Sequence, residues 1–310
     1  MMALPPELLV LAGPCLVVAL AYGYARFVEP RWLKITTISL ALLPPTAEAD
    51  GITILHLSDL HHSDAVSLGY LRRSLERAAQ TQPDIILLTG DYITTRIDDE
   101  RFLEILKLLP QAAPTLACPG NHDGGAWARK MAGYATTGPI RRLLEDAGIQ
   151  YLENDWVLIN VKGVALAIGG MGDLWARQCE PEALQESFNT AQADLKLLLS
   201  HNPDSKAKLG ALNWDLMLSG HTHGGQFRLP ILGAPFAPIK DKAFLVGLCS
   251  YGNRWIHVTA GLGNVHGLRF NCRPEISVIQ LVKCGQGEST GMQSLTQRIT
   301  QRPAPTNLEP

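Results

Sequence analysis

The chain has 310 residues, of which 46% are hydrophobic and 18% are charged. This composition excludes a disordered or low-complexity protein and allows one large buried core with short extensions. The formal net charge is −2, from 27 basic and 29 acidic residues, so no general attraction to nucleic acid is expected. The six cysteines form no C-x-x-C pair, and they neither require nor exclude a reducing compartment.

An apolar segment without charged residues runs from Leu8 to Ala25, and its 18 residues are about the minimum for a helix that spans a bilayer. The basic residues Arg26, Arg31 and Lys34 follow it, and no lysine or arginine precedes it. The positive-inside rule then predicts a single-pass anchor over residues 1–30 in the inner membrane, with the N-terminus outside and the following domain in the cytoplasm. An export signal, cleaved or retained, is the alternative interpretation.

After this segment, short apolar runs alternate with amphipathic helical patterns, which is typical of an α/β fold. Residues 31–50 are predicted to be a linker or a strand, residues 51–284 the main domain, and the Gln-, Ser- and Pro-rich residues 285–310 a disordered tail. The expected strands are 52–57, 85–89, 115–118, 156–161, 164–168, 195–199, 216–218, 255–259 and 276–281, and the expected helices are 67–79, 100–109 and 140–147.

Polar clusters follow five of these predicted strands. In chain order they are Asp59 with His61, Asp91, the G-N-H-D segment 120–123, His201, and the G-H-T-H segment 220–223. Because ligands of an α/β sheet bind at the carboxyl ends of its strands, we expect these clusters to meet at one edge of the domain. Their carboxylate, amide and imidazole groups are together typical ligands of two divalent cations.

The spacing within the clusters favours shared coordination. Residues two apart in extended backbone point to the same side, so Asp59 can act with His61, and His221 with His223. The two oxygens of Asp91 can bridge cations about 3.5–4 Å apart, as in two-metal phosphoryl-transfer sites.

Hydrolysis at phosphorus is the chemistry that such a ligand set favours. Two cations lower the pKa of a shared water and neutralise phosphate oxygens, so that a bridging hydroxide attacks in line. His122 is interpreted as the acid that meets the leaving oxygen, and Asp123 as the carboxylate that sets the tautomer of His122. The mixed oxygen and nitrogen ligands suit Mn²⁺ first, with iron or Zn²⁺ as alternatives.

The ordered set D-x-H, G-D, G-N-H-D, a later histidine and G-H-T-H resembles the calcineurin-like metallophosphoesterases, from about Leu55 to Leu281. The resemblance implies a metal-dependent phosphoesterase with a four-layer α/β/β/α sandwich, in which His122 lies beside the leaving group. The implied ligands of one metal are Asp59, His61, Asp91 and His223, and those of the second are Asp91, Asn121, His201 and His221.

Peripheral features indicate a narrower branch of that family. The apolar N-terminal segment, G-H-T-H-G-G-Q and a late G-L-G…R-F are similar to membrane-anchored bacterial phosphodiesterases and to UDP-2,3-diacylglucosamine diphosphatases of lipid A synthesis. A lipid-linked or cell-envelope phosphodiester or diphosphate is therefore the expected substrate. The alternatives are a broad phosphodiesterase acting on soluble nucleotides and a scaffold that has lost catalysis. No obligate protein partner is inferred.

Residues outside the clusters leave several alternatives open. Arg269, after a glycine-rich turn, is expected either to reach the substrate phosphate or to lie on the surface. His266 in that turn has no assigned role, whereas His56, His62 and His257 are expected to be ordinary core or surface histidines.

Two segments near the clusters bear on the substrate. Residues 127–142 combine aromatic and basic side chains, and they are interpreted either as a contact for an anionic headgroup and an acyl chain or as an amphipathic surface helix. Residues 226–248 are rich in proline, glycine and apolar side chains, and they are expected either to touch the membrane or to cover the second sheet.

Overall fold

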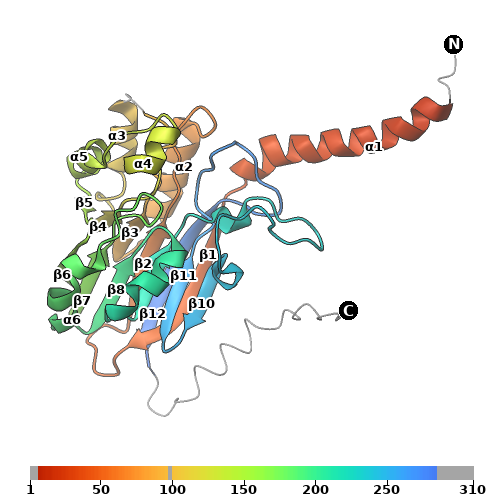
Figure 1. Cartoon of the computed structure of the whole chain (residues 1–310). Coiled ribbons are helices and arrows are strands. Elements are labelled where there is room, and N and C mark those ends of the chain that lie inside the picture. The colour runs from red at the N-terminus through yellow and green to blue at the C-terminus, as the bar shows by residue number, and fades with distance from the viewer. Residues whose placement is uncertain (1–5, 97–99, 285–310) are drawn as a thin grey trace.

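Apolar strands build two six-stranded sheets in the computed structural model, which describes residues 6–96 and 100–284 (Figure 1). The first sheet has the order β1-β12-β2-β3-β4-β5 and the second the order β10-β11-β9-β8-β7-β6. The strands of the first sheet are β1 (Lys34–Leu43), β2 (Gly51–Leu57), β3 (Ile85–Thr89), β4 (Thr115–Cys118), β5 (Gln150–Tyr151) and β12 (Glu275–Lys283). Those of the second are β6 (Asp155–Val161), β7 (Val164–Gly170), β8 (Leu195–Leu199), β9 (Leu216–Ser219), β10 (Gly247–Tyr251) and β11 (Arg254–Val258).

Most neighbouring strands run parallel, so their carboxyl ends lie at one edge. In the first sheet β2, β3, β4 and β5 are mutually parallel, β12 is antiparallel to β2, and β1 is parallel to β12. In the second sheet β7, β8, β9 and β11 are parallel, while β6 and β10 are antiparallel edge strands. This arrangement places the loops after β2, β3, β4, β8 and β9 together, as the sequence predicts.

Short helices cover the outer faces of the two sheets, whereas the N-terminal helix lies apart from them (Figure 1). The α-helices are α1 (Pro6–Gly23), α2 (Leu68–Ala79), α3 (Glu100–Leu106), α4 (Gly125–Lys130), α5 (Gly138–Asp146) and α6 (Gln185–Thr190). A π-helical turn, η1 (Tyr24–Val28), continues α1, and short 3-10 helices are η2 (Glu29–Arg31), η3 (Pro181–Ala183), η4 (Pro203–Ala211), η5 (His223–Gly225) and η6 (Lys242–Phe244).

Three apolar clusters define the layers. Leu75 of α2 and Phe102 of α3 pack with Leu88 on the outer face of the first sheet. A second cluster, which includes Ile54 and Leu197, lies between the two sheets. A third cluster, which includes residues of α6 and η6, covers the outer face of the second sheet. The predicted α/β fold is confirmed as a two-sheet structure, and the clusters follow the order of a four-layer sandwich.

Each predicted strand and helix is present, and its ends differ from the predicted ones by at most three residues. Strands buried along their whole length, such as β3, are the ones that read as continuous apolar runs. The two-residue β5, the edge strand β10 and the six-residue helix α6 were not predicted, and residues 127–142, one interpretation of which was a single amphipathic helix, form α4 and the start of α5 instead. Residues 34–43, predicted as linker or strand, form β1 and belong to the first sheet.

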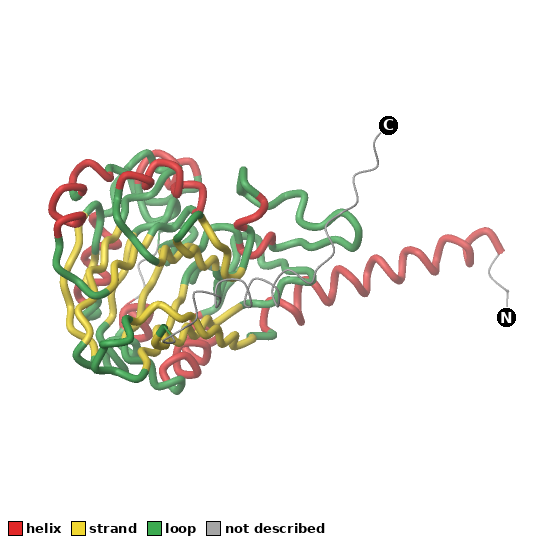
Figure 2. The backbone as a smooth tube through the Cα atoms, turned by 90° about the horizontal axis from the view of Figure 1, so that it is seen from below, coloured by secondary structure: helices red, strands yellow, loops and turns green. Residues whose placement is uncertain are grey.

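The N-terminal helix α1 projects away from the sheets (Figure 2). The side chains of Leu16, Val17, Val18 and Leu20 are each 60–68% exposed. Among the described residues, no helix is long and apolar enough to cross a membrane. The transmembrane anchor over residues 1–30 therefore stays a prediction. The expected disordered tail, residues 285–310, lies outside the described residues.

Candidate metal centre

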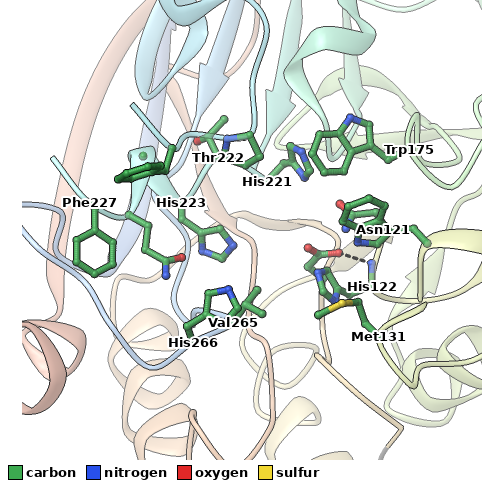
Figure 3. Close-up of a pocket in the computed structure, with 16 residues that line it drawn as sticks. Asn121, His122, Met131, Trp175, His221, Thr222, His223, Phe227, Val265 and His266 are labelled. Carbon is green, nitrogen blue, oxygen red and sulfur yellow. Dashed lines mark hydrogen bonds between the residues drawn. The ribbon is translucent and has the colours of Figure 1, made fainter. Parts of the chain in front are cut away.

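The loops at the carboxyl ends of the strands bring the seven predicted metal ligands to one place. Two groups of three residues each present ligand atoms within 4.8 Å of one another. Asn121, which follows β4, lines the same pocket as Asp91, His221 and His223 (Figure 3). The two groups are Asp59 with His61 and His223, and Asp91 with His201 and His221. These six residues fall into the two sets that the family resemblance implies, with Asp91 in the second group and Asn121 in neither.

Asp91 stands between the two groups. Its Oδ2 lies 3.5 Å from Nε2 of His61 and 3.1 Å from Nε2 of His201, so one carboxylate oxygen faces both groups. In the first group, Oδ1 of Asp59 lies 3.5 Å from Nε2 of His223. In the second, Nδ1 of His221 lies 3.2 Å from Nε2 of His201.

Five of the seven ligand residues have left-handed backbone, a conformation that costs a non-glycine residue roughly 1–2 kcal/mol. They are Asp59 (φ 54°), His61 (φ 47°), Asp91 (φ 56°), His221 (φ 67°) and His223 (φ 51°). Strand-to-loop hydrogen bonds hold these residues in place: Asp59 N donates to Gly90 O at 2.9 Å, and His61 N donates to Asp91 O at 3.0 Å. The left-handed conformation directs each of these side chains away from its strand end and toward the shared site.

Two glycines make room for the carboxylates. A Cβ on Gly120 would lie 2.3 Å from Oδ1 of Asp91, and a Cβ on Gly220 would lie 2.3 Å from Oδ2 of Asp59. Real side chains do not approach so closely, so only glycine fits at these two positions. The glycines that precede Asn121 and His221 in the sequence motifs therefore leave the space that the carboxylates of Asp91 and Asp59 occupy.

The donor set fits divalent cations. Nε2 of His61, Oδ1 of Asn121, Nε2 of His221 and Nδ1 of His223 are all buried and have no hydrogen-bond partner. Buried polar atoms without partners are costly, and four of them among the predicted metal ligands indicate a site that fits cations rather than an ordinary core. Their oxygen and imidazole chemistry suits Mn²⁺, iron or Zn²⁺.

The surroundings of most of these groups favour the deprotonated form, which is the form that binds a cation. Burial lowers the pKa of His221 to about 3 and that of His223 to about 4, and it also holds the pKa of His61 well below its usual value. Burial alone would raise the pKa of Asp91, but the imidazoles led by His201 outweigh it and hold that pKa well below its usual range. Burial lowers the pKa of His201, but the Asp91 carboxylate outweighs burial and raises it well above its usual value. At neutral pH the protein without metal thus pairs a protonated His201 with an ionised Asp91.

His122 and Asp123 take positions that correct the sequence interpretation in part. His122 lines the pocket, and its Nδ1 lies 3.3 Å from the carbonyl oxygen of Thr94, which sets the tautomer with Nδ1 protonated. The expected contact of Asp123 with that ring is wrong, because its two oxygens accept hydrogen bonds from the backbone of Asp91, Tyr92 and Gly120 at 2.7–2.8 Å. Asp123 therefore ties the loop after β4 to the loop after β3.

Arg269 is fully buried and does not line the catalytic pocket, so both expectations for it, a phosphate contact and a surface position, are wrong. Its guanidinium donates to the carbonyl oxygens of Ala260, Gly261, Gly263 and Cys272, at 2.5–3.1 Å. It therefore organises the glycine-rich turn from inside, where an unpaired carbonyl would be costly.

The other histidines divide as the sequence suggests. His56 and His257 are buried between the sheets, with their Nδ1 atoms 2.9 Å apart, and His62 is nearly buried. His266, which the sequence left without a role, lines the pocket beside Val265 (Figure 3).

The pocket over the ligands has a volume of about 380 Å³ and mostly apolar walls. Trp175 meets the His221 ring edge-on at 4.4 Å between centroids and packs against Trp127 at 4.8 Å. The other apolar lining residues are Met131, Phe227, Phe236, Pro238 and Val265. Trp175 and Thr94 were missed in the sequence because neither lies in a ligand motif, although Trp175 follows β7 at the same edge as the other site loops.

Residues 52–225 match the model of the family described as calcineurin-like phosphoesterase. The chain belongs to this family. The family match confirms the predicted metal-dependent phosphoesterase, and the two ligand groups are consistent with two divalent cations.

Named relatives of this phosphoesterase span most of its length. It is 40% identical to phosphodiesterase YaeI of Escherichia coli over 264 residues, which cover 84% of this chain and 93% of the relative. It is 32% identical to the uncharacterized metallophosphoesterase YkuE of Bacillus subtilis, with 87% and 93% covered. It is 26% identical to the UDP-2,3-diacylglucosamine pyrophosphatase LpxG of Chlamydia muridarum, with 84% and 93% covered.

We predict that a cation displaces a proton from His201. Its Nδ1 lies 2.6 Å from the carbonyl oxygen of Thr89 and keeps its proton, so Nε2 is the atom that must lose one. Because metal binding needs the deprotonated ring, the affinity for the cation should rise about tenfold per pH unit below the raised pKa of His201. Ring ¹⁵N chemical shifts at pH 7 measure both states. A neutral His201 ring in metal-free protein would contradict the prediction.

Arg269→Ala is expected to lower the free energy of unfolding by about 3–5 kcal/mol, because it leaves several buried carbonyl oxygens without donors. Chemical denaturation measures the loss, and Arg129→Ala on the exposed surface of α4 is the matched control. An Arg269→Ala protein with unchanged stability and a raised KM would instead restore the phosphate-binding role.

Proposed function

We propose that this phosphoesterase hydrolyses a phosphodiester or diphosphate bond in a lipid-linked or cell-envelope substrate, such as UDP-2,3-diacylglucosamine. The observation that carries the proposal is the apolar pocket directly over two clusters of metal ligands. The relative named as a UDP-2,3-diacylglucosamine pyrophosphatase supports the substrate class, and the relative named as a phosphodiesterase supports the bond type.

The pocket walls favour a substrate with a large apolar part. Trp127, Met131 and Trp175 form one wall, and Phe227 and Phe236 form another. A pocket of about 380 Å³ lies within the usual range for small-molecule sites, and apolar walls of this kind stabilise an apolar group through burial. Within the described chain, the residues that line it include no lysine and no arginine. Phosphate charge must therefore be balanced at the metal ligands, which suits a substrate with few phosphates.

Two divalent cations, of which we propose Mn²⁺ first, would be held by Asp59, His61, Asp91 and His223 on one side and by Asp91, Asn121, His201 and His221 on the other. When bound, they supply Lewis-acid neutralisation of the phosphate and activation of a water for attack.

His122 supplies the proton for the leaving oxygen in this proposal. The Thr94 carbonyl accepts from Nδ1 of His122, so Nε2 is the nitrogen from which the doubly protonated ring would release a proton to the leaving oxygen. The backbone N of His122 donates to Oδ1 of Asp91 at 2.8 Å, which fixes the imidazole beside the ligand clusters. Trp175, packed on His221, limits the access of bulk water to this side of the pocket.

We further propose that α1 attaches the enzyme to the inner membrane with the catalytic domain in the cytoplasm. The support is the exposed apolar surface of α1 and the position of Arg26, Arg31 and Lys34 after it. An attached enzyme meets a lipid-linked substrate without extracting it into water.

A soluble nucleotide is the second candidate substrate, favoured by one observation. The indoles of Trp127 and Trp175 are adjacent in the pocket wall, and such aromatic faces stack on nucleobases. The scaffold alternative is not supported, because all seven ligands gather at one pocket.

The substrate class is tested by assaying the detergent-purified full chain, loaded with Mn²⁺, on four compounds: UDP-2,3-diacylglucosamine, a glycerophospholipid, a cyclic nucleotide and an aryl phosphodiester. We expect the highest kcat/KM on the acylated diphosphate, because the apolar walls contact its acyl groups, and we expect EDTA to abolish all activity. Activity confined to the two soluble compounds would overturn the lipid substrate and favour the nucleotide alternative.

Asp91→Asn and His122→Ala should separate metal binding from proton transfer. We expect Asp91→Asn to lose turnover and metal content together, because Asp91 faces both ligand groups. His122→Ala should keep its metals and lose about 10²- to 10⁴-fold in kcat, the usual contribution of a general acid. Metal analysis beside steady-state kinetics measures both effects. Full activity in His122→Ala would refute its role as the acid.

A further inference from the structure

We propose that the apolar loop, residues 227–238, is a second membrane contact that enters the interface of an anionic phospholipid bilayer beside α1. This inference rests on the proposed function, because it explains how a lipid-linked substrate reaches the pocket. It concerns a surface distinct from the metal ligands, and its occupant is the bilayer itself.

The tip of the apolar loop exposes large apolar side chains to solvent. Ile231 is fully exposed, Leu232 is 70% exposed and Phe236 is 78% exposed. Ile231 also has left-handed backbone, with φ 68°, which is unfavourable for a β-branched residue. Glycine or asparagine would fit such a tight turn with less strain and without an apolar surface. The tip therefore presents apolar surface that burial in an apolar environment would stabilise.

The loop is held firmly at its base. Leu229 and Gly233 exchange two backbone hydrogen bonds, at 2.7 and 2.9 Å, and close the tip into a small hairpin. Beyond the tip, Ala237, Ile239 and Phe244 pack into the apolar cluster over the second sheet. One part of the segment 226–248 therefore covers the second sheet, which is one of the two interpretations of the sequence, and the tip remains exposed. A fixed base presents the tip in one direction.

The same part of the molecule holds the root of α1. Arg269 N donates to Ala25 O at 2.9 Å, and the Glu29 carboxylate accepts from the backbone of Asn271 and Cys272. The carbonyl oxygen of Phe270, the residue after Arg269, accepts a hydrogen bond from the backbone N of Arg228 in the apolar loop at 2.9 Å. One short segment therefore joins α1 to the apolar loop, and Figure 1 shows α1 and this loop, drawn in teal, on the same side of the molecule. A bilayer that receives α1 meets the loop tip as well.

Basic side chains lie near the bases of α1 and of the apolar loop. Lys34, Arg228 and Arg273 line a cavity of about 380 Å³, together with Trp32 and Glu29. Arg273 stacks over the Trp32 ring at 4.1 Å. Arg26 and Arg31 line a smaller cavity nearby in the chain, together with Asp64. The whole chain has a net charge of −2, so this local excess of basic groups is not a general property of the surface. Basic groups behind an apolar tip match anionic headgroups above acyl chains.

The apolar loop also extends from its exposed tip to the catalytic pocket. Phe227 and Phe236 belong to the loop and line the catalytic pocket. An apolar group that leaves the bilayer at the tip can therefore remain in contact with apolar side chains until its phosphate reaches the metal ligands. This continuity distinguishes the loop from a simple additional anchor.

The contact is tested with an environment-sensitive nitrobenzoxadiazole label at Ile231→Cys, in the full chain with Cys15, Cys249 and Cys284 replaced by serine. The control is Leu158→Cys, because Leu158 is 51% exposed on β6 at the far edge of the second sheet. With vesicles of phosphatidylglycerol and phosphatidylethanolamine, we expect a blue shift at position 231 and quenching by spin-labelled lipid, and neither at 158. Equal solvent exposure of both labels on vesicle-bound protein would overturn the proposal. So would a blue shift without vesicles that grows with protein concentration, which would assign the tip to a second copy of the chain.

A functional comparison separates this proposal from the proposed function. The double variant Ile231→Ser, Leu232→Ser should lose about tenfold in rate on a substrate carried in vesicles, because two apolar contacts with the bilayer are removed, and should keep its rate on a soluble aryl phosphodiester. Leu158→Ser should change neither rate. Equal vesicle rates in the two variants would overturn the membrane contact. A wild-type enzyme that inserts position 231 but hydrolyses only the soluble diester would support the contact and overturn the lipid substrate.

Discussion

The position of one carboxylate, that of Asp91, constrains the whole site. Its Oδ2 faces His61 from the first sheet and His201 from the second, and its Oδ1 accepts from the backbone of His122. Its backbone N donates to Asp123, and its carbonyl accepts from His61. These contacts lead to three different loops, those after β2, β4 and β8. The site can therefore form only when both sheets are packed against each other, and its geometry depends on the apolar cluster between them.

The strained ligands show how the fold stabilises this arrangement. Left-handed backbone at five ligand residues is unfavourable in isolation, and buried hydrogen bonds between strand ends hold it in place. Asp123 and Arg269 contribute from outside the ligand set, the first through backbone amides and the second through backbone carbonyls. Like Asp91, they position residues, and they bind backbone groups that no apolar residue could satisfy.

The strands, and the meeting of the predicted ligand residues at one edge, could be predicted because their signals are local. A buried parallel strand is a continuous apolar run, and a polar group directly after it must lie at the sheet edge. The roles of Asp123, Arg269 and Thr94 could not be predicted, because each depends on which backbone group a distant loop presents. The position of Trp175 could not be predicted either. Its contact with His221 depends on how the loop after β7 packs, and no spacing in the sequence indicates that packing.

The order of the first sheet has a consequence for how the protein is made. The strand β12 lies between β1 and β2, so within residues 6–96 and 100–284 β1 pairs with no strand except one that is translated about 240 residues later. During synthesis β1 has no strand to pair with until β12 has been made, whereas β2 to β5 can already pair with one another. Completion of this sheet is thus a late event, and a ribosome that stalls before residue 275 leaves an open strand edge exposed to chaperones or to aggregation.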